Sequence, residues 1–314
     1  MPETDSTPLA PPARLGLIGL GKMGLPMGRR LVASGFAVRG FDPLEEARAA
    51  FAEAGGTACG SAAEAAAGAE AVVTMLPNGE VVRRAVLEGA DAVAGAMRPG
   101  AILIEMSSSA PLSTRALGER LAALGIGLVD APVSGGVRKA EAGTLSIMLG
   151  GAGPALARIR PVLEAMGSAL FETGPLGSAH AMKALNNYVS AAGLIAACEA
   201  VQVGAAFGLD PVVMTDILNV STGRNNATEN KLKPFVLPET YDSGFGLALM
   251  TKDVGIAVEL AEALGHPAPF SHAVAAFARS ALARLGPEAD HTAVDRYLKL
   301  LAAPSLNAGS GEPG

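Results

Sequence analysis

Short apolar runs alternate with Ala-rich helical stretches along the first half of the chain. The runs that predict strands cover residues 14–18, 36–41, 71–76, 101–105, 127–131 and 145–149. Strands that alternate with helices in this way are typical of βαβ units, in which the strands form a parallel sheet. The pattern therefore predicts an α/β fold with a doubly wound parallel sheet.

After residue 177 the strand pattern ends and only helical patterns remain. They cover residues 178–207, 211–220, 247–264, 270–285 and 291–303. The second of these begins with Asp210 and Pro211, a pair typical of a helix cap and first turn. We therefore expect an α/β domain at 13–177 and an all-α C-terminal domain at 178–303. Disordered tails are expected at residues 1–12 and 304–314.

The helix predicted at 178–207 is apolar on nearly every side but carries Lys183, Asn186 and Asn187 within one and a half turns. At 3.6 residues per turn, Lys183 and Asn187 lie about 40° apart on one face. Such residues often form a solvated stripe on a surface helix. However, a helix that is apolar all round is normally buried, and a buried Lys is rare unless it is paired. The pattern alone leaves a structural and a functional interpretation open.

Composition narrows the classes to which this protein can belong. Its 314 residues are enough for about two domains, and a net charge of -6 argues against nucleic-acid or anionic-membrane partners. Two cysteines, Cys59 and Cys198, cannot form a disulfide framework. The N-terminal residues lack the pattern of an export signal, and no uninterrupted apolar run reaches membrane-spanning length. We therefore expect a cytoplasmic protein.

The first predicted strand leads into the glycine-rich segment IGLGKMGLPMGRRL, which has the spacing G-x-G-x-x-G. Between a strand and a helix, such glycines allow a tight turn, a close approach of the backbone to a pyrophosphate, and close packing of helix on strand. The segment therefore predicts a Rossmann-type, dinucleotide-binding domain. The residues expected at the cofactor are Gly19, Leu20, Gly21, Lys22, Met23 and Gly24.

Asp42 ends the second predicted strand. An acidic side chain at this position accepts hydrogen bonds from the ribose hydroxyls of NAD and repels the 2'-phosphate of NADP. Arg39 and Arg48 are the competing signal, because either guanidinium can fold over a 2'-phosphate, although neither directly follows the acid. The sequence therefore favours NAD.

Two further loops follow strand ends, where ligands of open α/β sheets bind. TMLPN at 74–78 and IEMSSSAP at 104–111 contribute Leu76, Pro77 and Ser108 to the expected cofactor site. Each loop taken alone is also an ordinary strand-to-helix connection.

The segment DAPVSGG at 130–136 contains Ser134, Gly135 and Gly136 in succession. Consecutive backbone N–H groups without bulky side chains are suited to bind an anion. A plain glycine-rich turn is the alternative interpretation.

In this order, the motifs resemble those of the β-hydroxyacid dehydrogenase family, which includes 3-hydroxyisobutyrate dehydrogenase, tartronate semialdehyde reductase and threonate dehydrogenase. The resemblance extends from Arg14 to about Ala302 and rests on GLIGLGKMGLPM, DAPVSGG, GPLGSAHAMKALNN and LMTKD. It implies an NAD-binding N-terminal domain, a C-terminal domain for substrate binding and dimerisation, and a catalytic Lys, which falls on Lys183. It also implies that Lys252 lies at the nicotinamide. The substrate-binding residues it implies are Ser134, Gly135, Gly136, Asn187 and Lys252.

The chemistry of alcohol oxidation suits Lys183. Loss of a hydride to NAD requires a base for the hydroxyl proton, and the reverse reaction requires an acid beside the carbonyl oxygen. A Lys serves both if burial and a helix N-terminus lower its pKa, and we place Lys183 in the first turn of a helix capped by Ser178. Asn187 can fix the hydroxyl, whereas Asn186 is expected to point elsewhere. No metal is expected, because the histidines show no ligand spacing.

The family resemblance implies a short 3-hydroxy acid of the 3-hydroxyisobutyrate, threonate, or glycerate/tartronate semialdehyde type. The polar segment STGRNNATEN at 221–230 either contacts the far end of this substrate or is a solvent loop. Its polarity slightly favours a polyhydroxylated or doubly anionic substrate. Lys252 and Asp253 can alternatively form a solvated pair at a helix start, and Asp253 is expected to orient that helix.

Three other functions remain open. Imine reductases share this architecture but usually carry another residue at the position of Lys183. A phosphogluconate-type decarboxylating enzyme needs a phosphate site and a longer C-terminal region. A non-catalytic NAD-binding module would not require Lys183, Asn187 and Ser134 together.

The long helix at 178–207 also bears on assembly. Its apolar surface extends around the helix, which is more than one helical domain needs for its own core. We therefore expect this helix to pack against a second chain in a homodimer or homotetramer.

Overall fold

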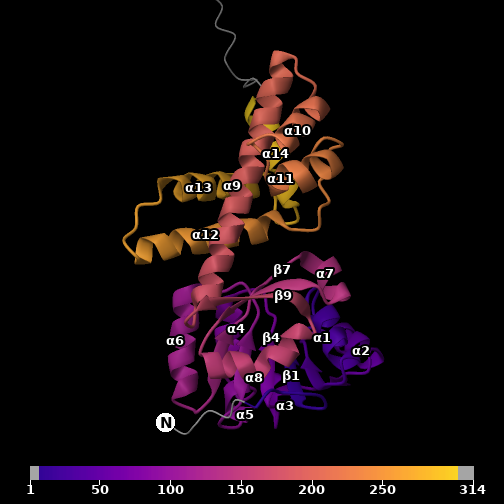
Figure 1. Ribbon diagram of the computed structural model, residues 1–314, viewed down its shortest axis with the longest axis vertical. Helices are drawn as coiled ribbons and strands as arrows, with labels where there is room; N and C mark the ends of the chain where they lie inside the picture. Colours follow the sequence, from indigo (N-terminus) through magenta and orange to yellow (C-terminus); the bar gives the residue numbers. More distant parts are fainter. Residues whose placement is uncertain (1–6, 303–314) are drawn as a thin grey trace, which may run out of the picture. The chain divides into compact units, whose positions relative to one another are not determined.

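The computed structural model describes residues 7–302 and divides the chain into two compact units, Met1–Ala184 and Leu185–Gly314 (Figure 1). The first unit contains a nine-stranded sheet with helices between its strands. The described part of the second unit consists of helices and their connections. The expected order, an α/β fold followed by an all-α region, is confirmed.

The sheet has the strand order β3-β2-β1-β4-β5-β6-β8-β7, with β9 paired to β8. The pairs from β3 to β6 are all parallel, as in a doubly wound sheet, whereas β8 is antiparallel to β6 and β7. The strands are β1 (Arg14–Ile18), β2 (Ala37–Phe41), β3 (Thr57–Ala58), β4 (Ala71–Thr74), β5 (Ile102–Glu105), β6 (Gly127–Asp130), β7 (Val133–Ser134), β8 (Leu145–Gly150) and β9 (Gly167–Gly174).

All six strands predicted from apolar runs are present, and three others are not predicted. β3 and β7 contain two residues each, which is too short to produce a hydrophobic pattern. β9 is longer, but most of its side chains are exposed or half-buried, so it has no apolar run.

Side chains of the central strands alternate between two cores, as the two-residue period of a strand requires. Along β4, Ala71 and Val73 face the first core and Val72 the second, and along β5, Ile104 and Leu103 divide in the same way. The first core is closed by α1 (Gly24–Ala33), α2 (Glu45–Glu53), α7 (Gly136–Ala142) and α8 (Gly153–Glu164). The second is closed by α3 (Ala62–Ala66), α4 (Gly79–Leu87), α5 (Val93–Ala96) and α6 (Pro111–Ala122). Burial on both faces explains why these strands are continuous apolar runs.

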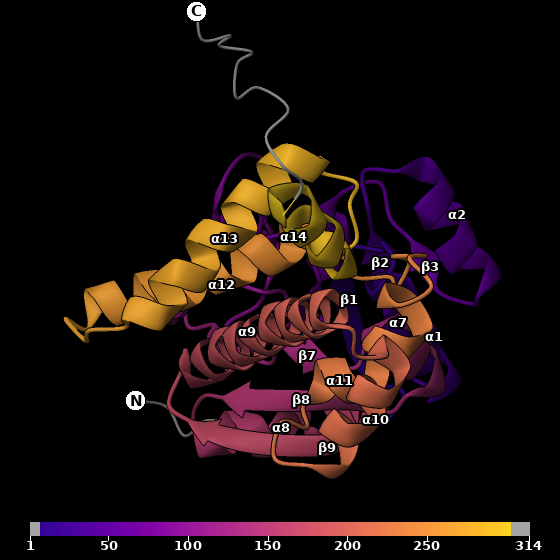
Figure 2. The same ribbon diagram turned by 90° about the horizontal axis from the view of Figure 1, so that it is seen from above.

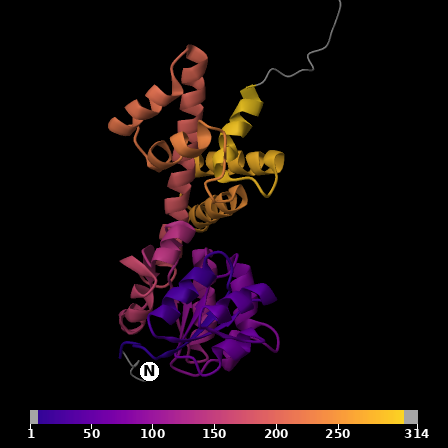
Figure 3. The same ribbon diagram turned by 90° about the vertical axis from the view of Figure 1, so that its right-hand side faces the viewer.

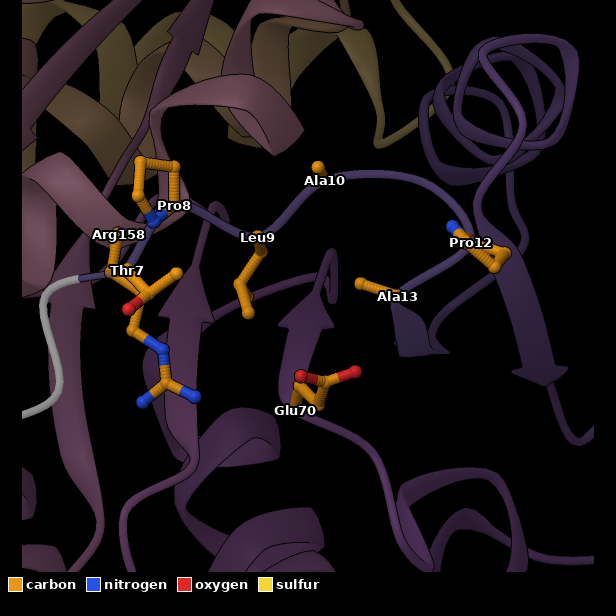
Figure 4. A pocket seen from close by; sticks show the side chains of 8 residues that line it. All are labelled: Thr7, Pro8, Leu9, Ala10, Pro12, Ala13, Glu70 and Arg158. Atoms are coloured by element: carbon orange, nitrogen blue, oxygen red, sulfur yellow. The ribbon is translucent and has the colours of Figure 1, made fainter.

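A hollow at the amino ends of β1 and β4 lies away from the strand ends where the candidate site is expected (Figure 4). The segment before β1 crosses it, and Leu9 is buried there with its N–H bonded to the Arg158 carbonyl oxygen at 2.8 Å. Residues 7–12 thus belong in part to the packed structure, while residues 1–6 of the expected tail lie outside the described residues. Ligands of open α/β sheets bind at the opposite, carboxyl ends of the strands.

Helices of the second unit surround the later part of α9 (Ser178–Phe207), which begins in the first unit. In Figure 3, orange α10 (Pro211–Val220) and α11 (Asn226–Asn230) lie on one side of α9 and the yellow helices on the other. Figure 2 shows α12 (Leu247–Ala263) and α13 (Pro269–Leu285) running side by side. The remaining elements are a π-helical turn (Leu232–Val236), a 3-10 turn (His291–Ala293) and α14 (Val294–Ala302).

The predicted helices of this unit agree with the observed ones, and Asp210 caps α10 by accepting from the N–H groups of Val212 and Val213. The short α11 and the π-helical turn are not predicted. Residues 303 and 304–314 of the expected C-terminal helix end and tail lie outside the described residues.

Within the described residues, α9 is the one helix with the length and composition to cross a membrane, and a third of its most apolar window is buried inside the chain. Its buried residues Leu194, Cys198 and Val201 form part of the core of the second unit. Its first turn is bonded to a carboxylate of the sheet. These features are those of a core helix, although its surface is less buried than the apolar pattern predicts.

Candidate active site

The loop after β1 has the geometry that a bound pyrophosphate requires. Gly19 has a φ of +98°, and a Cβ there would collide with the Met75 carbonyl oxygen. A Cβ on Gly24 would collide with the Gly19 carbonyl oxygen, so the turn and the start of α1 both need glycine. At Gly21, by contrast, a Cβ would meet nothing within 4 Å, which leaves the backbone open to a ligand. These residues therefore fit a dinucleotide.

Asp42 follows β2 directly and is 9% exposed. Its Oδ2 accepts from the N–H of Leu20 at 2.8 Å, and its Oδ1 accepts from the N–H of Leu44 at 2.9 Å. The carboxylate is thereby fixed beside the glycine-rich loop, with lone pairs left for ribose hydroxyls. Arg39 is engaged with Glu64 at 3.0 Å, whereas Arg48 donates to the Asp42 carbonyl oxygen at 2.6 Å. Of the two arginines, Arg48 is therefore the one bonded to the residue expected at the adenosine ribose.

The loops after β4 and β5 are joined to each other. The N–H of Leu76 donates to Ser107 Oγ at 2.9 Å, and the N–H of Ser107 donates to Glu105 Oε1 at 2.9 Å. Leu76 and Ser108 are half-buried and Pro77 is exposed, so all three predicted residues remain accessible at the strand ends.

Ser134, Gly135 and Gly136 form the link between β7 and α7, on the part of the sheet beyond β8. Gly135 and Gly136 have φ values of +130° and +68°, which disfavour any residue with a side chain. A Cβ on Gly136 would meet nothing within 4 Å. Gly135 and Gly136 are exposed and Ser134 is half-buried, which leaves the backbone of the turn accessible to an anion.

The start of α9 is held by Asp130, the last residue of β6. Asp130 Oδ1 accepts from the N–H of Gly177 and Oδ2 from the N–H of His180, both at 2.8 Å. The expected cap, Ser178, instead bonds through its hydroxyl to Thr173 at 2.7 Å. A carboxylate at a helix N-terminus both satisfies free N–H groups and offsets the positive end of the dipole.

Lys183 is the sixth residue of α9 and lies in its second turn, not its first as expected. Its side chain is partly buried. Since Asp130 compensates the helix end, the dipole is a weaker influence on Lys183 than the sequence suggested.

His180, one turn before Lys183, is a residue that sequence reasoning did not single out. It is 1% exposed, and its Nε2 lies 2.7 Å from Glu105 Oε2. In the sequence, Glu105 stands at the end of one predicted strand and His180 in a distant predicted helix, and nothing else links the two residues. Their separation of 75 positions conceals the pairing.

Within the second unit, Asn187 is fixed by Asp253 of α12. Asn187 Nδ2 donates to Asp253 Oδ2 at 2.6 Å, and Lys252 Nζ lies 3.5 Å from Asp253 Oδ1. Asn186, expected to point elsewhere, donates to Asn187 Oδ1 at 3.1 Å. Asp253 thus orients Asn187 directly and pairs with Lys252.

The segment at 221–230 uses part of its polarity for its own fold. Asn225 caps α11 and forms a capping box with Thr228. Arg224 pairs with Glu229 at 3.6 Å. Whether this segment contacts substrate stays a prediction.

Comparison with known proteins identifies the family. A family model described as the NAD binding domain of 6-phosphogluconate dehydrogenase matches residues 14–174. A second, described as NAD-binding of NADP-dependent 3-hydroxyisobutyrate dehydrogenase, matches residues 177–298. The structure of Mycobacterium tuberculosis 3-hydroxyisobutyrate dehydrogenase with L-serine has a TM-score of 0.84 and 36% identity, covering 91% of this chain and 99% of that one. The chain belongs to the β-hydroxyacid dehydrogenase family.

Full-length relatives show what members of this dehydrogenase family act on. The chain is 35% identical to 2-(hydroxymethyl)glutarate dehydrogenase of Eubacterium barkeri, over 94% of this chain and 98% of that protein. It is also 35% identical to the NAD-dependent L-serine dehydrogenase of Pseudomonas aeruginosa, over 90% of this chain and 97% of that protein. This β-hydroxyacid dehydrogenase is therefore an NAD-binding oxidoreductase, and both of its units belong to the matched region.

Proposed function

We propose that this dehydrogenase oxidises a short 3-hydroxy acid with NAD and uses Lys183 as its general acid and base. The observation that carries the proposal is the arrangement on α9, where Lys183 and Asn187 are one turn apart and Asn187 is oriented by Asp253. Oxidation of a hydroxyl needs a group that transfers its proton and a group that holds it in place, and Lys183 and Asn187 can supply these from one helix face.

Bound NAD supplies a hydride acceptor for the carbinol carbon. The neutral amine of Lys183 takes the hydroxyl proton during oxidation, and its ammonium returns a proton to the carbonyl oxygen in the reverse direction. Asn187 holds the hydroxyl through its remaining amide hydrogen, because the other is donated to Asp253. By the family resemblance, the turn from Ser134 to Gly136 would bind the carboxylate, and Lys252 would contact the nicotinamide and the substrate.

We propose NAD as the preferred cofactor. The carboxylate of Asp42, fixed by the N–H of Leu20 at 2.8 Å, suits ribose hydroxyls and repels a 2'-phosphate. Arg48 is the feature that favours NADP, but its guanidinium donates to the carbonyl oxygens of Asp42 and Pro43.

The relatives suggest which 3-hydroxy acids to test. 2-(Hydroxymethyl)glutarate, L-serine and 3-hydroxyisobutyrate share a hydroxymethyl group on the carbon that carries the carboxylate. We propose this 3-hydroxypropanoate core as the recognised part of the substrate. A panel of these acids with threonate and glycerate, assayed by NAD reduction, should give turnover with at least one hydroxymethyl acid. Turnover with none of the panel, by protein that binds NAD, would contradict the proposal and favour a non-catalytic module.

We propose further that a second copy of this chain covers the exposed face of α9 and α10. Phe207 is 85% and Val220 87% exposed, which is unusual for large apolar side chains. The other exposed apolar residues of these helices and their connection include Val203, Leu209, Val212, Val213 and Ile217. A homodimer or homotetramer buries this surface, and the two free thiols, Cys59 and Cys198, accord with a cytoplasmic location.

A further inference from the structure

A fully buried charged cluster lies under the first turn of α9, inside the first unit. The side chain of His180 is enclosed by Glu105 from the end of β5, Asp130 from the end of β6, and Thr114 from α6. Glu105 is 1% exposed and Asp130 is 0% exposed. Charged groups are rarely buried this completely unless they pair.

Hydrogen-bond geometry assigns a proton to Nε2 of His180 and leaves Nδ1 able to donate or accept. Nε2 faces Glu105 Oε2 at 2.7 Å and the Ser107 carbonyl oxygen at 3.1 Å, and neither of these oxygens can donate when the carboxyl is ionised. Nδ1 lies 2.8 Å from Thr114 Oγ1, whose own hydrogen goes to the Ala110 carbonyl oxygen at 3.1 Å. With that hydrogen on Ala110, Nδ1 donates to Thr114 Oγ1 and the ring is an imidazolium; in the neutral tautomer the hydroxyl turns and donates to Nδ1 instead.

Electrostatics favour the imidazolium form. Burial disfavours the charged forms, yet the attraction between the two groups raises the pKa of His180 and lowers that of Glu105. Asp130, 3.8 Å from Nδ1, adds to the attraction on His180.

The cluster also reaches the loop expected to hold the cofactor. Glu105 Oε1 accepts from the N–H of Ser107, and Ser107 Oγ accepts from the N–H of Leu76. Buried and partly buried bonds therefore connect the loop after β4, through the loop after β5, to the turn of α9 that precedes Lys183. His180 and Lys183 are three positions apart, so they are neighbours on the helix surface.

We infer that His180 is a positioning residue for Lys183: it locks the turn of α9 that carries the lysine to the strand ends that carry Ser107 and Leu76. The inference rests on the proposed acid and base role of Lys183. If the cluster only stabilised the fold, apolar side chains could replace it, since buried ion pairs are often no more stabilising than apolar packing. A fixed direction for the lysine side chain does require a specific, directional anchor.

The test compares His180→Gln with His272→Gln, a control on the exposed face of α13. Each is assayed with NAD and with 3-hydroxyisobutyrate or L-serine, whichever the wild-type enzyme turns over. We expect kcat of His180→Gln to fall about 10- to 100-fold, as for a catalytic group displaced by about 1 Å, with KM for NAD within about threefold. The deuterium isotope effect on kcat from substrate labelled at the carbinol carbon should rise, because the chemical step becomes slower. Glu105→Gln provides a second, isosteric variant if His180→Gln does not fold.

A double variant separates positioning from a merely structural role. If His180 acts through Lys183, Lys183→Ala with His180→Gln should be no slower than Lys183→Ala alone. Losses that multiply, or a His180→Gln protein with lowered Tm but unchanged kcat and isotope effect, would overturn the inference. Near wild-type turnover by Lys183→Ala would instead overturn the proposed role of Lys183, and the positioning role with it. Loss of activity in Lys183→Ala with an unimpaired His180→Gln would overturn positioning only.

Discussion

Asn187 donates from Nδ2 to Asp253 Oδ2 at 2.6 Å, so a residue of α12 fixes which way the amide of α9 faces. A carboxylate can only accept this bond, and the amide oxygen of Asn187 is thereby turned away from Asp253. Asp253 is 4% exposed and also lies 3.5 Å from Lys252 through its other oxygen. One buried carboxylate thus orients Asn187 and lies beside Lys252, both of them predicted substrate residues.

Removal of this carboxylate should weaken substrate binding. Asp253→Ala removes the charged partner of the Asn187 amide and leaves it the bond from Asn186, and a hydrogen bond to a charged partner contributes about 1.5–3 kcal/mol. We therefore expect KM for the hydroxy acid to rise roughly 10- to 100-fold while KM for NAD changes little. Steady-state kinetics measure both, and Glu259→Ala, on an exposed position of the same helix, is the control. An unchanged substrate KM would exclude the orienting role.

Lys183→Ala should lower kcat by roughly 10²- to 10⁴-fold, the usual contribution of a positioned proton transfer. Lys183→Arg should restore little, because a guanidinium stays protonated and cannot accept the hydroxyl proton. NAD affinity, measured by fluorescence titration, should hardly change in either variant. Lys233→Ala, which removes an exposed lysine paired with Asp216, should keep wild-type activity.

Much of the fold follows from the sequence because local patterns determine it. Ala71, Val72 and Val73 are buried on both faces of the sheet, so their strand is a plain apolar run. Gly24 packs against the Gly19 carbonyl oxygen within one strand–turn–helix unit, and Gly19 itself has a positive φ, which is why their spacing identifies the turn.

The parts that sequence reasoning missed depend on partners far apart along the chain. Asp130 caps α9 from 50 positions away, so Ser178, the local candidate, was the wrong cap. The pairing of Glu105 with His180 and of Asn187 with Asp253 likewise joins separate elements. Propensity and periodicity report on neighbours in sequence and carry no information on such contacts.

Asp42→Asn should shift cofactor preference toward NADP. The substitution keeps one acceptor oxygen but removes the negative charge that repels a 2'-phosphate, and it leaves the guanidinium of Arg48 in place. The ratio of kcat/KM for NAD to that for NADP should fall at least about tenfold, which corresponds to about 1.4 kcal/mol. Arg48→Ala added to Asp42→Asn should raise this ratio again in part, because the guanidinium that can bind a 2'-phosphate is then absent. An unchanged ratio would show that Asp42 does not select the cofactor.

Charged residues on the apolar face of α9 and α10 should prevent assembly. Phe207→Asp with Val220→Asp places two carboxylates where we propose a partner chain, and burying them unpaired is costly. Light scattering at micromolar concentration should show an oligomer for the wild-type protein and a monomer for the variant. Asp216→Ala with Glu199→Ala, changes at exposed polar positions of the same helices, should keep the wild-type mass. A monomeric wild-type protein would refute the proposed assembly.

The buried pair of His180 and Glu105 should give the protein a pH-dependent stability. The folded-state pKa of His180 is raised above its ordinary 6.5, because Glu105 and Asp130 outweigh the opposing effect of burial. The contribution of His180 to the free energy of unfolding is therefore complete below pH 6.5 and is lost as pH rises through the raised pKa. The pKa of Glu105 is lowered below its ordinary 4.5, since the His180 charge and the Ser107 bonds outweigh burial. The contribution of Glu105 to the free energy of unfolding is complete above pH 4.5 and is lost as pH falls through the lowered pKa.

Both contributions are thus complete between pH 4.5 and 6.5. Urea unfolding of the wild-type protein and of His180→Gln, each measured from pH 5 to pH 10, isolates the pair. We expect the difference in the free energy of unfolding to be largest at the acidic end and to shrink as pH rises, because the imidazolium loses its proton and no longer pairs with Glu105. The matched variant His272→Gln should show no such trend, since that ring is exposed. A difference that stays constant or grows toward pH 10 would mean that His180 is neutral in the folded protein, and the ring would then bond only as an uncharged donor and acceptor.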